Sequence, residues 1–260
     1  MFENKVKTLL AEGKAAWGAG LPDRSDFIAK LTVDTGIDFL WIDTEHRPYD
    51  ATDIPWIPVL CRMKGCVPIV RVAGLDPQLI KKALDVGAAG VMLPQINNAE
   101  EARRAVQYAK YPPEGSRGVS PWWTFFMDVS YEEYLPAANQ ETCVIVQIES
   151  REAIDNLEEI AAVEGVDVLF AGPLDITAAL GHIGQLEHPE IQGFLEEFPR
   201  RAASCGKASG ITLRGFEAGR KAYDAGYRFI VIGGLIIQGI EGLKADLERL
   251  RAYARESASS

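Results

Sequence analysis

Residues 67–94 read VPIVRVAGLDPQLIKKALDVGAAGVMLP, and the order of apolar and polar residues in this stretch decides the fold. Two short apolar runs, Val67–Val72 and Gly90–Pro94, flank a segment, Pro77–Val86, whose apolar residues recur every three or four positions. Asp76 before a proline is a helix start signal, and Gly87 is a stop signal. The stretch therefore predicts a strand, a helix and a second, parallel strand.

The same alternation continues along the whole chain. Six further apolar runs have the length and composition of buried strands: Ala15–Gly18, Phe39–Asp43, Cys143–Glu149, Val166–Gly172, Ser209–Leu213 and Phe229–Gly233. Helical periodicity also extends over Asn98–Lys110, Arg151–Val163, Pro189–Cys205 and Phe216–Ala225. Eight such units predict a single-domain (β/α)₈ TIM barrel, an α/β fold, over residues 1–260.

An open, doubly wound sheet is the main alternative fold. It would be favoured by a glycine-rich dinucleotide loop after the first strand, and Trp17-Gly18-Ala19-Gly20 does not have that pattern. One long interruption, at about residues 111–141, separates the fourth and fifth predicted strands. We expect it to be a loop, and loops of this length are usually functional or mobile.

The overall composition excludes several classes of partner. The 260 residues are 47% hydrophobic and carry a formal net charge of −10, which argues against nucleic acid and against anionic membranes as partners. The chain has no apolar run of about 18 residues that could span a bilayer. Four cysteines without zinc-ligand spacing are typical of a cytoplasmic enzyme with free thiols.

Carboxylates follow two neighbouring strands, at the end where a barrel carries its active site. Glu149 ends the fifth predicted strand and Asp175 follows the sixth, so their side chains can converge. Two hard oxygen ligands suit a divalent cation such as Mg²⁺ or Mn²⁺. Each residue also lies at the start of a helix, where a carboxylate is favourable without any metal. Both interpretations stay open at this point.

A second polar cluster, Asp43, Glu45 and His46, follows the second strand, and Arg71 ends the third. An arginine so deep in a strand needs a partner, which could be Glu45 or Glu149, or it stabilises a developing oxyanion. Asp43 and His46 have the arrangement of an acid–histidine pair, in which the carboxylate orients a proton-carrying imidazole. A turn histidine beside acids would give the same pattern.

Other chemistries were weighed on the same residues. Gly233-Gly234 could receive a phosphate at a helix N-terminus or form a tight turn. A phosphate-binding isomerase or epimerase and a non-catalytic scaffold are therefore alternative functions. Schiff-base chemistry needs a desolvated lysine inside the barrel, and Lys207 precedes the seventh strand, at the wrong end. We expect His182 and His188 to be structural or peripheral.

Five motifs occur in order with compatible spacing: Ile42-Asp43-Thr44-Glu45-His46, Val70-Arg71-Val72, Tyr111-Pro112-Pro113-Glu114-Gly115-Ser116-Arg117-Gly118, Val146-Gln147-Ile148-Glu149 and Gly172-Pro173-Leu174-Asp175. Together they resemble the HpcH/HpaI aldolases, the metal-dependent class II pyruvate aldolases. The resemblance extends from about Trp17 to Gly234.

The resemblance implies reversible cleavage of a 4-hydroxy-2-oxo acid to pyruvate and an aldehyde. It implies that Glu149 and Asp175 hold the divalent metal, Mg²⁺, Mn²⁺ or Co²⁺. It further implies that Arg71 contacts the carbonyl oxygen and that His46, oriented by Asp43, transfers protons.

The resemblance also implies substrate contacts and an assembly. The pyruvate half would be bound by the segment around the sixth strand end and by two further strand residues: Gly172, Pro173, Leu174, Gln147 and Trp17. The subunits would form a homo-hexamer, a trimer of dimers, with the last helix exchanged between subunits.

Some residues depart from the family pattern. Thr44 stands where a glycine is common, and Trp122 and Trp123 lie in an aromatic stretch that is more polar in the sugar-acid enzymes. We expect these tryptophans at a subunit interface, where aromatic residues are enriched, or in a lid over the aldehyde pocket. Leu213 and Arg214 after the seventh strand are candidate acceptor-side residues, and Arg214 could bind an anionic tail of the aldehyde.

Overall fold

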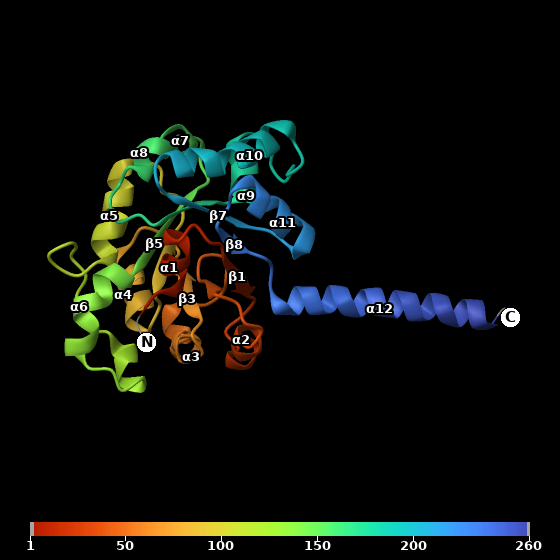
Figure 1. Ribbon diagram of the computed structural model, residues 1–260, viewed down its shortest axis with the longest axis horizontal. Helices are drawn as coiled ribbons and strands as arrows, with labels where there is room; N and C mark the ends of the chain where they lie inside the picture. The colour runs from red at the N-terminus through yellow and green to blue at the C-terminus, as the bar shows by residue number, and fades with distance from the viewer. Residues whose placement is uncertain (1–2, 259–260) are drawn as a thin grey trace.

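Eight parallel strands close into a barrel in the computed structural model, which describes residues 3–258 (Figure 1). Each strand pairs with the next along the chain, and the last pairs with the first. The strands are β1 (Ala16–Leu21), β2 (Phe39–Asp43), β3 (Val67–Arg71), β4 (Gly90–Leu93), β5 (Cys143–Ile148), β6 (Val168–Ala171), β7 (Ala208–Thr212) and β8 (Phe229–Val231). The predicted TIM barrel is confirmed.

Helices surround the barrel in sequence order. They are α1 (Lys5–Ala11), α2 (Asp26–Val33), α3 (Trp56–Met63), α4 (Pro77–Asp85), α5 (Ala99–Ala109), α6 (Tyr131–Glu141), α7 (Arg151–Asp155), α8 (Leu157–Ala161), α9 (Pro173–Ala179), α10 (Pro189–Ser204), α11 (Gly215–Ala225) and α12 (Leu235–Ala258), with 3₁₀ turns η1 (Ala51–Asp53) and η2 (Trp122–Phe126). The start signal before α4 works as predicted, because the Asp76 carboxylate accepts from the backbone N–H groups of Gln78 and Leu79.

Three elements differ from the sequence prediction. β1 continues to Leu21 instead of ending at Gly18. The predicted helix Arg151–Val163 is two short helices, α7 and α8, separated at Asn156. Residues 111–141, predicted as one long loop, contain η2 and α6, so only the part before α6 connects as a loop.

The barrel has an apolar layer inside its strands and another between strands and helices. Phe39 and Phe229 stack in the lumen with ring centroids 4.0 Å apart, and Phe170 packs edge-on against Phe229. Gly18 makes room for this layer, since a Cβ there would lie 2.2 Å from the Phe39 ring. The inner layer fills the lumen, so the barrel is a packed core and its reactive groups lie at its end.

The two ends of the barrel are covered differently. Val6 of α1 is buried against residues at the starts of the strands, so this helix closes the amino-terminal end. At the other extreme of the chain, α12 projects away from the barrel, and β1 and α2 are the elements it contacts most (Figure 1). Across residues 3–258, the structure has no helix of the length and apolar character that a membrane span requires.

Candidate active site

Side-chain alternation along the strands selects the residues that face the lumen at the carboxyl end. In β2 and β3, Asp43 and Arg71 are paired in register, one layer beyond the packed interior. In β5, Gln147 points to the same side, and Glu149 follows it by two residues. These four side chains are buried, and together they form the floor of the candidate site.

Arg71 is held from three sides by acceptors. Its Nε and Nη2 atoms lie 2.9 and 2.8 Å from the two carboxylate oxygens of Asp43, a bidentate ion pair. Its Nη1 atom lies 3.0 Å from Glu45 Oε2, and the guanidinium lies 4.7 Å from the centre of the Trp41 ring. Burial raises the pKa of the Asp43 carboxyl, but its hydrogen bond to Arg71 and the charge of Arg71 hold that pKa below its usual range.

Glu149 is anchored in place but poorly compensated in charge. Its Oε1 atom accepts from the backbone N–H of Gln95 at 2.8 Å, and its Oε2 atom accepts from Gln147 Nε2 at 2.6 Å. Burial raises the pKa of the Glu149 carboxyl to about 7, and the neighbouring charges of Asp175 and Glu45 add to this effect. A carboxylate in such surroundings is stabilised by an incoming cation.

The residues of this end fit a divalent metal. Asp175 lies in the first turn of α9, is exposed, and is near enough to affect Glu149 electrostatically. Gly172 leaves room for the Glu149 carboxylate, because a Cβ there would lie 2.7 Å from Glu149 Oε2. Two hard carboxylate donors that are open to solvent suit a cation that keeps several of its waters. The donor set therefore agrees with the predicted metal ligands, whose role stays a prediction.

The predicted contact between Asp43 and the His46 ring is not present. Asp43 accepts from the backbone N–H of His46 at 3.3 Å, while both of its oxygens are engaged by Arg71. The His46 ring instead lies with Nε2 3.7 Å from Glu45 Oε2, and its side chain is 63% exposed. Asp43 thus positions Arg71, and Glu45 is the carboxylate beside the imidazole.

Two predicted contact residues point out of the barrel. Trp17 alternates with the lumen-facing residues of β1, and its ring packs on Tyr223 of α11 with centroids 6.0 Å apart. Leu213 also belongs to the layer between strands and helices. The prediction that Trp17 and Leu213 contact the substrate is therefore corrected, because period-two alternation places both on the helix side.

The two tryptophans of η2 have separate environments. Trp123 is fully buried in a satellite cluster with Tyr111 and Tyr134, and Arg62 lies 4.0 Å from its ring centre. The expectation of an acceptor-side Trp123 is corrected accordingly. Trp122 is 39% exposed and makes an edge contact with Phe126, with centroids 4.4 Å apart. Trp122 thus belongs to an exposed aromatic surface.

The glycines after β8 have a packing role. The backbone N–H of Gly20 donates to Gly233 O at 2.7 Å, and a Cβ on Gly234 would lie 2.7 Å from Gly20 O. This close approach explains Gly234, and the left-handed backbone of Gly233, with φ of 106°, explains the other glycine, so they give no support to a phosphate site. Arg214, the residue before α11, is exposed and lies beside Gly233.

Two residues of the site were not assigned from the sequence. Glu45 was expected only as a possible partner of Arg71, and its place beside the His46 ring was not predicted. Gln95, two residues after β4, was not among the predicted site residues. Its left-handed backbone, with φ of 54°, presents its N–H to Glu149. A non-glycine residue in that conformation costs energy, but no sequence pattern marks it in advance.

Comparison with known proteins defines the class to which this fold and site belong. A sequence model of the HpcH/HpaI aldolase/citrate lyase family matches residues 21–233, and the chain belongs to this family. It is an aldolase, a carbon–carbon lyase. The resemblance seen in the five sequence motifs is thereby confirmed.

Particular relatives sharpen this assignment. The 5-keto-4-deoxy-D-glucarate aldolase of Salmonella paratyphi C (strain RKS4594) is 39% identical over 236 residues, which cover 90% of this chain and 91% of that protein. An HpcH/HpaI aldolase/citrate lyase family protein from Burkholderia cenocepacia J2315 has a TM-score of 0.88 at 34% identity, covering 95% of this chain and 99% of that one. HpcH/HpaI aldolase from Desulfitobacterium hafniense DCB-2 has a TM-score of 0.85 at 30% identity, with coverages of 94% and 96%.

Proposed function

We propose that this chain cleaves a 4-hydroxy-2-oxo acid reversibly to pyruvate and an aldehyde, with a divalent cation at Glu149 and Asp175. The observation that carries the proposal is the charge imbalance at the carboxyl end of the barrel. Four carboxylates, from Asp43, Glu45, Glu149 and Asp175, lie at this end together with the buried guanidinium of Arg71. Such a site favours a cation and a substrate that brings its own polar oxygens.

The cleavage step leaves an enolate, so catalysis needs positive charge at its oxygen. A cation held by Glu149 and Asp175 would polarise the keto group and offset part of that charge. Arg71 supplies further N–H donors from the end of β3, in an orientation fixed by Asp43. The backbone amides of Leu174 and Asp175, which open α9, would receive the pyruvate carboxylate.

His46 is the residue placed to move protons. Its imidazole is exposed at the mouth and has the Glu45 carboxylate 3.7 Å away. An imidazole can both accept and donate a proton, so His46 can take the proton of the 4-hydroxyl in cleavage and return it in condensation. Glu45 is itself held by Arg71 at 3.0 Å, which ties the proton carrier to the oxyanion donor.

Pyruvate release from a panel of 4-hydroxy-2-oxo acids, with Mg²⁺, Mn²⁺ or Co²⁺ added, tests the proposal. We expect cation-dependent release by the wild type and at least a thousandfold loss in Glu149→Ala, because the enolate charge is then uncompensated. Glu152→Ala is the matched control, since Glu152 is exposed on α7 near the same strand end. Undiminished release by Glu149→Ala would contradict the proposal.

The acceptor is proposed to be an aldehyde that carries a carboxylate, as in the cleavage of 5-keto-4-deoxy-D-glucarate named for the relatives. Arg214 supports this choice, because its guanidinium has no ion-pair partner within residues 3–258 and stands at the barrel rim beside Gly233. Arg214→Ala should raise KM for an acidic acceptor about tenfold and leave a neutral aldehyde unaffected. Equal effects on both acceptors would remove Arg214 from the acceptor site.

We also propose that α12 is exchanged between subunits of a homo-hexamer, a trimer of dimers. Its apolar residues form an exposed seam with alternating four- and three-residue spacing: Ile236, Ile240, Leu243, Leu247 and Leu250. Such a heptad pattern packs against another apolar surface, and α12 has little of its own barrel to pack on. A cytoplasmic location remains a further prediction from the free cysteines.

The mass of the particle in solution tests the exchange. Leu243→Glu with Leu247→Glu should break the assembly into smaller particles by light scattering, because the seam then carries buried charge. Lys244→Glu is the control on the same turn, where the wild-type residue is already polar and exposed. A double variant of unchanged mass would rule out a role for this seam.

A further inference from the structure

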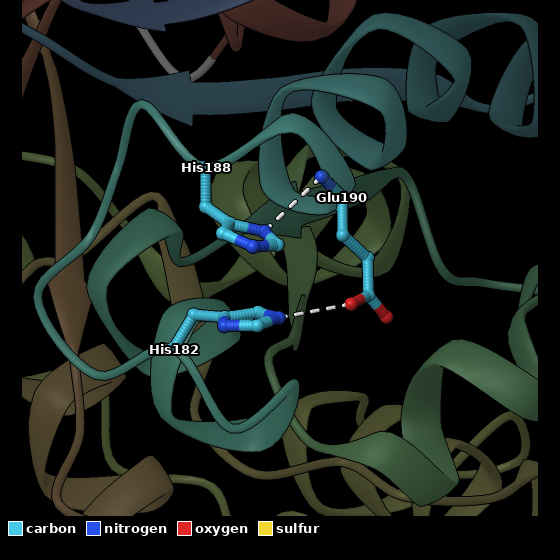
Figure 2. Close-up of side chains that lie close together, drawn as sticks. All are labelled: His182, His188 and Glu190. Atoms are coloured by element: carbon cyan, nitrogen blue, oxygen red, sulfur yellow. Dashed lines mark hydrogen bonds and ion pairs between the residues drawn. The ribbon is translucent and has the colours of Figure 1, made fainter.

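Two histidines and a glutamate meet outside the catalytic site, between α9 and α10 (Figure 2). His182 lies in the connecting loop, His188 precedes α10, and Glu190 lies in the first turn of that helix. One ligand atom from each of the three side chains lies within 4.8 Å of the other two. The three side chains are described below as the His-His-Glu cluster.

The loop that carries the cluster is fixed by its own hydrogen bonds. The backbone N–H of His182 donates to Thr177 O at 2.7 Å, and the N–H of Gly184 donates to Thr177 Oγ1 at 2.8 Å. Gln185 N–H then donates to His182 O, and His188 N–H to Gln185 O, at 2.8 and 3.0 Å. The backbone of the two histidines is therefore arranged before any ligand binds, which lowers the entropy cost of binding.

The side chains already occupy a geometry close to that of metal ligands. His182 Nε2 lies 3.0 Å from Glu190 Oε2, a separation that two ligands of one small cation can adopt. The His188 ring stacks on the His182 ring with centroids 3.4 Å apart. Figure 2 shows the two rings one above the other, with the Glu190 side chain beside them. A modest rotation of the His188 ring would turn one of its nitrogens toward the same point.

We propose that the His-His-Glu cluster is a second metal site, for a nitrogen-preferring transition ion such as Zn²⁺. Two imidazoles and one carboxylate form a donor set that suits Zn²⁺ and Co²⁺ and is unsuited to Mg²⁺, which prefers oxygen ligands. All three side chains reach solvent, so an ion can enter and keep a water as its fourth ligand.

Two existing contacts oppose the ion, and both are weak. His188 Nδ1 accepts from the backbone N–H of Glu190 at 3.3 Å, a helix cap that ligation through this ring would loosen. Arg151 Nη2 lies 3.9 Å from Glu190 Oε1, and both side chains are about half exposed. Such an exposed ion pair contributes little, so neither contact prevents binding.

The cluster is chemically distinct from the catalytic carboxylates. The catalytic donors follow β5 and β6, and Asp175 lies at the start of α9, whereas the cluster lies beyond the end of that helix. A bound ion would tie the loop after α9 to the start of α10. It would therefore stabilise the helix that presents Asp175 without taking part in the chemistry.

Zn²⁺ binding to the full-length metal-stripped protein tests the proposal, measured by calorimetry in the Asp175→Asn background with excess Mg²⁺. We expect His182→Ala, His188→Asn and Glu190→Gln each to weaken Zn²⁺ binding at least tenfold. His46→Ala is the matched control, because His46 is the one histidine of the sequence outside the cluster. Co²⁺ should give a visible absorption band that the same three variants lose.

His188→Asn separates a metal ligand from a structural cap. Asparagine is a better helix cap than histidine, so this variant should fold normally, keep the melting temperature of the metal-free protein and lose the rise that Zn²⁺ gives the wild type. The proposal would be overturned if the double variant His182→Ala, His188→Asn bound Zn²⁺ as tightly as the wild type. No Zn²⁺ binding in the Asp175→Asn protein would also overturn it.

Discussion

The two ends of the barrel both bury charged side chains, but cations and acids are mixed at one end, whereas acids predominate at the other. At the amino-terminal end, Lys7 pairs with Asp167 at 2.8 Å, and the buried Lys110 ammonium donates to the backbone carbonyls of Asn139 and Thr142. At the carboxyl end, acids outnumber buried cations, and the pKa of Glu149 is raised to about 7, by burial first and then by neighbouring acids. Acids that gather at one end of a barrel perturb the pKa values there, and such perturbed groups are typical of functional sites.

His46→Ala should give the largest effect at the reactive end. We expect turnover to fall by roughly 10² to 10⁴, because a positioned proton carrier contributes that much. Cation affinity should be unchanged, since the proposed cation ligands are Glu149 and Asp175 and the His46 ring is not one of them. Steady-state kinetics together with a cation titration measure both quantities. Loss of cation binding in this variant would reassign His46 to the metal site.

Arg71→Lys should follow, with a loss in kcat of about 10² to 10³. A lysine keeps the charge but cannot form the bidentate pair with Asp43, so the donor loses its fixed direction. KM should change less than kcat, because the contact matters most when the enolate forms. A variant in which only KM changes would show that Arg71 binds substrate without stabilising the enolate.

Asn4→Ala examines the amino-terminal end of the barrel and should leave the chemistry unaffected. The buried Asn4 amide donates to Ala89 O at 2.9 Å and to Glu141 O at 2.8 Å, and its carbonyl caps α1. The variant should lose about 1–3 kcal/mol of unfolding free energy, from the unpaired carbonyls and the lost cap. Denaturant unfolding measures this loss, and kcat should equal that of the wild type. A fall in kcat at low temperature, where the variant is still folded, would show that this end of the barrel also affects the chemistry.

Glu149→Gln should change the stability of the metal-free protein in a way that depends on pH. In metal-free protein the folded-state pKa of Glu149, about 7, exceeds its ordinary value of 4.5. The folded protein therefore holds the proton more tightly than the unfolded chain, and unfolding free energy falls as pH rises from about 4.5 to about 7. The variant should gain stability over the wild type by about 1–3 kcal/mol at pH 8 and little at pH 4. Thermal unfolding of both proteins in a chelator, at pH 4 and at pH 8, measures this gain. If the pKa of Glu149 is normal, the difference in stability between variant and wild type will be the same at both pH values.

Much of the fold follows from the sequence, because the strand and helix periods repeat eight times. The errors occur where local signals conflict with tertiary contacts. Gly20 reads as a turn residue, yet its N–H pairs with Gly233 O and β1 continues. Asn156 carries no breaking signal, and it separates α7 from α8 while its side chain donates to Asn97 O at 3.0 Å.

The site was predictable in its residues and less so in its contacts. Asp43, Arg71, Gln147 and Glu149 all lie on the lumen side, as their places at strand ends indicated. The pairing of Asp43 with Arg71 depends on the register of two strands that are 28 residues apart at this point. Sequence spacing favoured the nearer His46 as the partner, so the error was one of register.

Cation dependence of pyruvate release tests the central claim that the uncompensated carboxylates require a divalent ion. The wild type should lose nearly all activity in a strong chelator and regain it when Mg²⁺, Mn²⁺ or Co²⁺ is added in excess. Asp175→Asn should need a far higher cation concentration for the same activity, since one of the two ligands has lost its charge. Full activity of the wild type in the chelator would contradict the account.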